Sequence, residues 1–320
     1  MAYFSLSIYS ISINKRNKPE EHEFLDCFDE GKSLMDMIDN LFKGWHKGRH
    51  ISEKRPVDSE PNRVSRIRQE ADGSFIHFRM DPCLSGIIES GAFGTEESII
   101  NHKTGDERYR KLKDDAAMVP FYFCFYIPRH SKRGYLVLER IGNNGIYTML
   151  RNFLTKEVGN MLTGSYVLKI EPFIVKSVLN RNIDLMLNLS KVFLRGVKGS
   201  VFHAGIPLEG IAGSGSVEPE IVLSVKPQGQ ERVRSLILSL LNRNDKGRLV
   251  VDNVECRDVA FQVKIGGQLK KVSVCNLGSL GTSIDISDTV KRGPDGYPVF
   301  KSIDKEADRL ISFIDEASES

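Results

Sequence analysis

The stretch from Met118 to Leu162 constrains the fold more than any other part of the sequence. Its first part, residues 121–127, is a run of seven apolar residues rich in aromatic side chains. A run of this length and composition favours a strand buried on both faces over a helix. A basic turn at 128–134 separates it from a second apolar run at 135–141. After the turn Gly142-Asn-Asn-Gly145, whose residue types accept positive φ, apolar residues recur at helical spacing up to Leu162. The pattern predicts strand, turn, strand, turn and helix.

The rest of the chain alternates between short apolar strands and amphipathic helices. Strands are predicted at 3–13, 63–68, 74–80, 164–175, 220–225, 248–254, 259–265 and 269–275, and helices at 33–42, 230–241 and 304–317. The segment 190–197 is short and basic. Residues 63–80 are interpreted as a hairpin, and residues 81–117, with four glycines, as an irregular excursion. These elements predict an α+β fold, with mixed or antiparallel sheets and flanking helices.

The distribution of small residues predicts two lobes. Residues 203–216 are rich in glycine, serine and alanine, which is typical of a flexible linker or a mobile loop. We therefore expect an N-terminal α+β lobe at 1–202, with a basic excursion at 43–68. The C-terminal lobe would occupy 217–320, as strand, helix, strand, hairpin and helix.

Composition narrows the class of protein. The chain has 320 residues, of which 40% are hydrophobic and 27% charged, which is usual for a folded globular protein. No apolar run reaches the length of a membrane span, and the first residues lack the basic start of a signal peptide, so we expect a cytoplasmic protein. The five cysteines are scattered and form no CxxC pair, which favours neither a zinc site nor a disulfide framework. We expect no metal and no cofactor.

Catalytic motifs are absent from the sequence. It holds no GxxxxGK[ST], HExxH or GxSxG pattern and no EF-hand loop. Asp26, Asp29, Glu30 and Lys32 loosely resemble an acid-x-Lys nuclease centre, but they do not fall on the strand hairpin that such a centre uses. The sequence therefore does not favour an enzymatic function, but a nuclease is kept as an alternative.

Clustered positive charge is the main functional signal. The net charge is only +3, but the segment 43–68 is rich in basic residues and contains the only tryptophan, Trp45. A basic loop with an embedded aromatic suits phosphate contacts and base stacking. The alternative is a solvated loop with Trp45 packed on the preceding helix. The predicted nucleic-acid-binding residues are Lys43, Trp45, Lys47, Arg49, Lys54, Arg55, Arg66, Arg68, Arg129, Lys132, Arg133, Lys270 and Lys271.

Over most of residues 118–317, the order of elements resembles that of the RexA phage-exclusion proteins of temperate phages. The segments that carry the resemblance are Val-Leu-Lys-Ile-Glu-Pro-Phe at 167–173 and Ile-Val-Leu-Ser-Val-Lys-Pro at 221–227. The basic excursion at 43–68 and the longer C-terminal loop do not match. The resemblance implies a dimeric DNA-binding protein that tolerates many sequences. It also implies a membrane-protein partner that depolarises the cell after phage infection.

The function predicted from these observations is a phage-defence or phage-exclusion protein that binds DNA, or alternatively RNA, through basic loops. It would act as a sensor for a partner effector and carry no catalytic residue. Two alternatives remain: a nuclease effector of an abortive-infection system, and a protein–protein interaction module that binds no nucleic acid.

Overall fold

The computed structural model describes residues 3–46, 51–53, 62–69, 76–78, 83–173, 189–196, 220–241, 249–251, 254–265, 268–273 and 283–318. The chain divides into two compact units. The first comprises Met1–Phe173 together with Ile284–Ser320, and the second comprises Ile174–Ser283.

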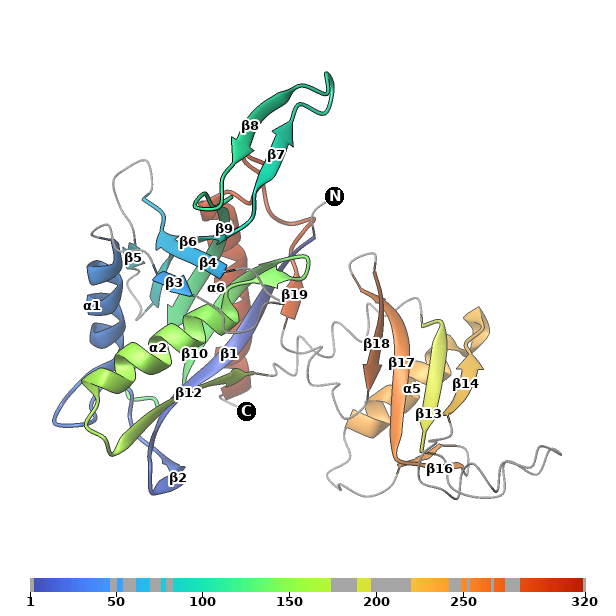
Figure 1. The fold of residues 1–320 in the computed structure, drawn as a ribbon. Coiled ribbons are helices and arrows are strands. Elements are labelled where there is room, and N and C mark those ends of the chain that lie inside the picture. Colours follow the sequence, from blue (N-terminus) through green and yellow to red (C-terminus); the bar gives the residue numbers. More distant parts are fainter. Residues whose placement is uncertain are drawn as a thin grey trace, which may run out of the picture. The chain divides into compact units, whose positions relative to one another are not determined.

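The first unit is built on a curled antiparallel sheet (Figure 1). Its main path runs β12 (Tyr166–Pro172), β1 (Phe4–Lys15), β10 (Gly134–Ile141), β9 (Val119–Tyr126), β6 (Cys83–Phe93), β4 (Asn62–Ile67) and β3 (Ile51–Glu53). Four short strands pair beside this path: β2 (Lys18–His22), β5 (Ile76–Phe78), β11 (Asn144–Gly145) and β19 (Ser283–Asp285). The strand pair predicted in the stretch 118–162 is confirmed, with β9 and β10 antiparallel in the centre of the sheet.

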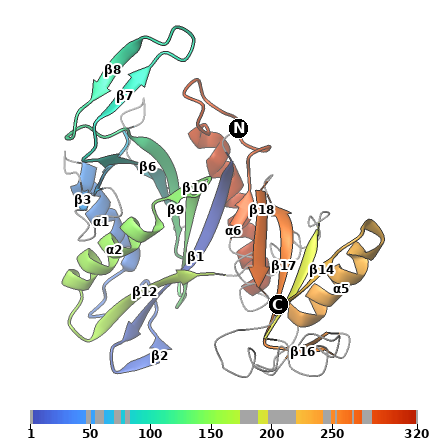
Figure 2. The same ribbon diagram turned by 45° about the vertical axis from the view of Figure 1, so that its right-hand side comes forward.

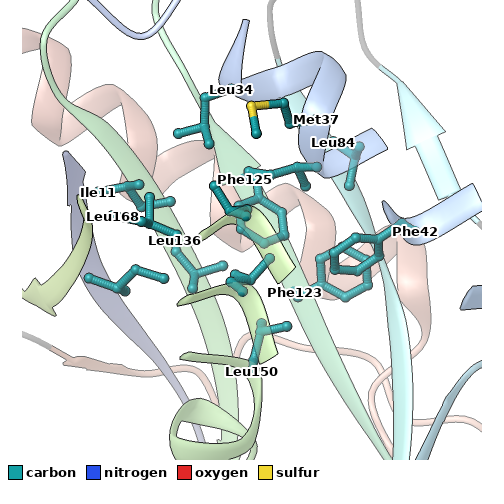
Figure 3. Close-up of a cluster of buried hydrophobic side chains, with 14 of the residues drawn as sticks. Ile11, Leu34, Met37, Phe42, Leu84, Phe123, Phe125, Leu136, Leu150 and Leu168 are labelled. Atoms are coloured by element: carbon teal, nitrogen blue, oxygen red, sulfur yellow. The ribbon is translucent and has the colours of Figure 1, made fainter. Parts of the chain in front are cut away.

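Two helices cover one face of this sheet (Figure 3). They are α1 (Leu34–His46), where a helix was predicted at 33–42, and α2 (Tyr147–Met161), which was predicted from its apolar spacing. Phe42 of α1, Phe123 of β9 and Leu150 of α2 are fully buried between the helices and the sheet. Burying each such side chain contributes about 1.5–3 kcal/mol, so this cluster dominates the stability of the unit.

A third helix, α6 (Phe300–Ser318), covers the opposite face of the sheet (Figures 1 and 2). That face is also apolar. Leu6 and Ile8 of β1 point to the side of the sheet opposite α1 and α2, and both are buried. The hydroxyl of Tyr122 donates a hydrogen bond of 2.6 Å to Asp304 of α6. The sequence placed this helix in a C-terminal lobe at 217–320, whereas the structure joins residues 284–320 to the first unit. The predicted linker at 203–216 lies outside the described residues.

Glu139 of β10 is a buried carboxyl on the face covered by α6, with 3% of its surface exposed. Its Oε2 accepts the backbone N–H of Tyr122 at 2.9 Å, and within the described ranges its Oε1 has no hydrogen-bond partner. Burial raises the pKa of Glu139 to about 8, although the hydrogen bond from Tyr122 favours the charged form. The folded protein therefore holds this carboxyl mainly protonated at neutral pH.

Residues 81–117 were predicted as irregular, and the structure shows two well-formed pieces instead. The first is β6, an 11-residue strand in the middle of the sheet. The second is a hairpin of β7 (Glu97–Ile100) and β8 (Glu107–Lys111). The glycines that suggested a loop are tolerated in β6 because packing decides strand formation. Likewise β4 and β5 do not form the predicted hairpin with each other, because both pair with β6.

Gly91 shows why β6 contains glycine. A Cβ atom at this position would lie 2.6 Å from the backbone carbonyl oxygen of Ala117, which cannot move without shifting the chain. Gly91→Ala is therefore expected to lower the free energy of unfolding by about 1–3 kcal/mol. Gly159→Ala is the matched control, because this site on α2 has open space around it and alanine should raise stability by up to about 1 kcal/mol. Chemical denaturation of both variants tests the pair, and equal effects would contradict the clash.

In its described residues, the second unit consists of a four-stranded antiparallel sheet, a small hairpin and the helix α5 (Gln230–Leu241). The order of the sheet is β14 (Glu220–Ser224), β13 (Lys191–Arg195), β17 (Asp258–Ile265) and β18 (Gln268–Ser273). After the short 3-10 turn η2 (Pro227–Gly229), α5 packs Ile237 and Leu240 against Val192, Leu194 and Val259. A small hairpin of β15 (Leu249–Val251) and β16 (Val254–Cys256) joins the same core. The predicted α+β class is confirmed in both units.

Candidate nucleic-acid interface

The basic turn between β9 and β10, residues 128–133, is held firmly in place by a second loop. Pro128 follows the end of β9, and His130 adopts a left-handed backbone with φ of 50°. Asp26 stabilises this conformation, because its Oδ2 accepts the backbone N–H of His130 at 2.8 Å. The N–H of Leu25 donates to the carbonyl of Ser131 at 2.8 Å. The turn is therefore anchored to the loop at 23–28 and presents its side chains outward.

Three cations of this turn are exposed and available to an anion. Arg129, Lys132 and Arg133 all lie on the surface. None of them forms an ion pair with a carboxylate in the part of the chain that the structure describes. The Nζ of Lys132 lies 5.0 Å from the centre of the Phe24 ring, and the guanidinium of Arg133 lies 5.6 Å from that of Phe173. These cation–π contacts orient two of the three charges without neutralising them.

The hairpin of β1 and β2 brings further cations near this turn, but they are paired. Lys15 binds Glu23 at 3.1 Å and Lys18 binds Glu21 at 2.8 Å. The hydrogen bond from Lys18 lowers the pKa of Glu21, and the positive charges of Lys15 and Lys132 act in the same direction. Arg129, Lys132 and Arg133 of the β9–β10 turn, by contrast, form no ion pair with a carboxylate in the described residues, although Asp26 binds His130 of the same turn and the charge of Lys132 acts on Glu21.

Two other predicted cations, Arg66 and Arg68, do not join this cluster. Arg66 lies on β4 and forms an ion pair with Glu89 at 2.7 Å. Strands β6 and β9 separate β4 from β10, a distance of about 14 Å at ordinary strand spacing. Arg68, half-buried, directly follows β4. Lys43 is exposed on α1, where it pairs with Asp39.

Trp45 belongs to the hydrophobic core. Only 3% of its surface is exposed. Its ring lies 5.5 Å from that of Phe42 and 4.8 Å from that of Phe153, both measured between ring centres. Trp45 therefore lies within α1 and packs against α1 and α2, rather than in a loop after the helix, and its side chain is not available to stack on a base.

The remaining predicted residues stay predictions. Lys47, Arg49, Lys54 and Arg55 lie outside the described residues. Lys270 and Lys271 belong to β18 of the second unit, and their side chains lie outside the described part.

The acidic group that resembled a nuclease centre has a structural role. Asp29 accepts hydrogen bonds from the Nζ of Lys32 at 2.7 Å, and from the N–H and hydroxyl of Thr163 at 3.1 and 2.7 Å. The bond from Lys32, then those from Thr163, lower the pKa of Asp29 to about 2. The carboxylate thus ties a tight turn, with positive φ at Asp29, Glu30 and Gly31, to the end of α2. Within the described ranges, no group of three or more His, Cys, Asp or Glu side chains is placed to hold a metal ion.

Sequence reasoning found the basic turn but missed its aromatic partners. Phe24, with 46% of its surface exposed, and Phe173 come from segments far from residues 128–133 in the chain. No spacing pattern links the three segments, since the sheet brings them together. The pairing of β1 with both β10 and β12 brings Phe173 to the turn, and the hydrogen bond from Leu25 to Ser131 brings Phe24 there.

Among the helices of the described ranges, none is both long and apolar enough to cross a membrane. No protein-family model matches the chain, and no curated protein matches it in a sequence search.

Proposed function

We propose that this protein binds DNA without strong sequence preference, through backbone phosphates at the β9–β10 turn. One observation carries the proposal: Arg129, Lys132 and Arg133 lie within five residues, exposed and without carboxylate partners in the described chain. Arginine and lysine bind phosphate oxygens through charge-assisted hydrogen bonds, and each contact releases condensed counterions from DNA. Contacts of this kind position a protein on DNA but carry no sequence information.

The proposal extends to phage exclusion in the cytoplasm, with a membrane-protein effector as partner. It is supported by the resemblance in the order of elements to the RexA proteins. The two segments that carry the resemblance coincide with β12 and with β14 and the turn after it. A plating assay tests this role: cells that express the chain should reduce phage plating only when the membrane-protein partner is also present. RNA remains the alternative ligand.

Replacing Arg129, Lys132 and Arg133 together by alanine is expected to weaken DNA binding and its dependence on salt. The slope of log affinity against log salt concentration should become shallower by up to about 3, or one for each phosphate contact removed. Fluorescence anisotropy of two labelled duplexes of unrelated sequence, over a series of salt concentrations, measures this. Both duplexes should be affected equally.

A matched triple variant separates a local site from net charge. Lys156, Lys301 and Lys305 are exposed on α2 and α6, and their replacement by alanine removes the same total charge. This control should retain most of the affinity and of the salt slope. Equal weakening by both triples would contradict a site at the β9–β10 turn. Absence of any complex at low salt would refute nucleic-acid binding, and metal-dependent loss of the labelled DNA would favour the nuclease instead.

A further inference from the structure

Strand β14 forms one edge of the sheet of the second unit (Figure 1). Within the described residues it pairs only with β13, so the backbone N–H and C=O groups on its other side can bind a further strand. Two of its apolar side chains are half-exposed, Val222 at 47% and Leu223 at 46%. An open edge that carries exposed apolar side chains favours the addition of a strand.

The usual protection of an edge strand is missing from β14. Its five residues include no lysine and no proline, and its register with β13 has no bulge. Its one charged residue, Glu220, lies at its first position and accepts a hydrogen bond from Arg195 at 2.8 Å. The opposite edge strand, β18, carries the adjacent lysines Lys270 and Lys271, which oppose pairing. Of the two edges of this sheet, β14 is therefore the one suited to accept a strand.

The backbone of β14 has the phase that pairing on its open side requires. The N–H of Val225, just after β14, donates to the carbonyl of Ser190 at 2.9 Å. Because the direction of the backbone groups alternates along an antiparallel ladder, those of Leu223 also point toward β13. The N–H and C=O groups of Val222 and Ser224 therefore point toward the open edge.

The segment from Glu220 to Lys226 is complementary to itself when two copies pair antiparallel about Leu223. The chain stays extended as far as Lys226, whose φ is −79° and ψ is 156°. In this register Leu223 lies opposite the second copy's Leu223, Val222 opposite the second copy's Ser224, and Glu220 opposite the second copy's Lys226. Opposite residues are an even number of positions apart in the sequence, so their side chains point to the same face. A two-fold axis makes each contact between unlike residues twice, as a symmetric dimer requires.

Both faces of the paired strands gain a favourable contact. On one face, Ile221 and Val225 pack against the core beneath α5. Leu223 lies between them in the sequence and points the same way, so the two copies of Leu223 extend this core across the axis. On the other face, Lys226 is exposed and forms no ion pair in the described part of the chain. Across the axis it meets the carboxylate of Glu220, which can accept from a second cation.

From this pattern we infer that β14 is a dimerisation site, at which it pairs antiparallel with β14 of a second copy of this chain. Val222 of one copy and Ser224 of the other exchange both of their backbone hydrogen bonds, and the axis repeats this pair. The two sheets become one continuous sheet, with α5 of both copies on the same face. Each copy uses its one suitable edge, so the assembly closes at two copies. The inference goes beyond the proposed DNA binding and does not depend on it.

Charge substitutions at Leu223, which lies on the two-fold axis, test this interface in the full-length protein. Leu223→Lys alone and Leu223→Asp alone each place like charges opposite one another and remove an apolar contact, so each should weaken self-association about tenfold or more. An equimolar mixture of the two variants places opposite charges at the axis, so it should form a one-to-one heterodimer. Sedimentation velocity over a range of concentrations, without nucleic acid, measures association, and native mass spectrometry reports the composition of the dimer.

Ser224→Pro tests the backbone hydrogen bonds of the same interface. Proline lacks the N–H that Ser224 presents to the open edge, whereas the ladder with β13 does not use that N–H. The variant should therefore keep the circular dichroism spectrum of the wild type, and its self-association should weaken about tenfold or more.

Val250→Lys is the matched control. Val250 is an apolar residue of β15 in the same unit and is 53% exposed, so the same change there should leave association unchanged. A wild-type protein that stays monomeric at every concentration overturns the inference. So does a dimer that Leu223→Lys and Ser224→Pro leave intact, or a mixture of the two Leu223 variants that gains nothing over its components.

Discussion

Trp45→Ala is expected to lower the free energy of unfolding by about 3–5 kcal/mol, the cost of removing a large aromatic side chain from a packed core. The side chain is 3% exposed and lies against Phe42 and Phe153, so its removal leaves a cavity between α1 and α2. Circular dichroism in denaturant is the appropriate measurement, because the variant lacks the only tryptophan of the chain. At temperatures where the variant is folded, its affinity for DNA should equal that of the wild type.

Phe24→Ala is the opposite case, because it removes an exposed aromatic side chain beside the basic turn instead of a buried one. Phe24 is 46% exposed and lies beneath the ammonium group of Lys132, so its loss should change stability by less than about 0.5 kcal/mol. Without the Phe24 ring, the Lys132 side chain can adopt other orientations, so the affinity for DNA should fall a few-fold. If Trp45→Ala abolished DNA binding and left stability unchanged, the tryptophan would be a binding residue after all.

The buried carboxyl of Glu139 should make stability fall as pH rises. The pKa of Glu139 is about 8 in the folded protein, whereas an unperturbed glutamate has a pKa of about 4.3. Below the lower value both states hold the proton, and this group adds no pH dependence. Between the two values the unfolded chain releases a proton that the folded chain keeps, so the free energy of unfolding falls by about 1.4 kcal/mol per pH unit. From about pH 6 to pH 8 the loss amounts to about 2 kcal/mol.

Glu139→Gln should remove this dependence. Glutamine is neutral at every pH and still offers a carbonyl oxygen to the N–H of Tyr122, which now donates to Oε2 of Glu139 at 2.9 Å. Denaturation curves at a series of pH values compare the two proteins, with Glu20→Gln as a control at an exposed site. Parallel pH profiles for the wild type and Glu139→Gln would show that the carboxyl is not buried in its neutral form.

Much of the fold follows from apolar spacing in the sequence. The strands β9 and β10 and the helices α2 and α5 lie where the periodicity placed them, because each buries a continuous run or stripe of large side chains. At the start of α1, the hydroxyl of Ser33 accepts the N–H of Asp36 at 3.4 Å, as an N-cap residue does.

The parts that sequence reasoning missed depend on contacts between distant segments. Strand β6 contains glycines at 86 and 91 that weaken the strand pattern, yet β4, β5 and β9 all pair with it. The assignment of α6 to the wrong lobe has the same origin. Its apolar stripe indicated a helix, but nothing local indicates that it covers β6 and β9 rather than the strands that precede it in the chain.

The candidate site was predictable in its charge and not in its geometry. Five consecutive residues from Arg129 to Arg133 identify a basic turn from composition alone. Whether an aromatic residue serves binding or the core depends on burial, which separates Phe24 from Trp45. A lysine or arginine already paired with a carboxylate, as Arg66 is with Glu89, cannot be recognised from spacing when its partner lies 23 positions away.

The placement of α6 also bears on how the protein is made. The ribosome synthesises the strands of the first unit, then the whole second unit, and only then β19 and α6. Until α6 emerges, the sheet face that carries Leu6, Ile8 and Tyr122 has no cover, so the first unit stays incomplete while the second can already fold. Such exposed apolar surface makes a nascent chain prone to aggregation. We expect a chain that stops before residue 300 to be captured by chaperones, even though it retains every residue of the basic turn.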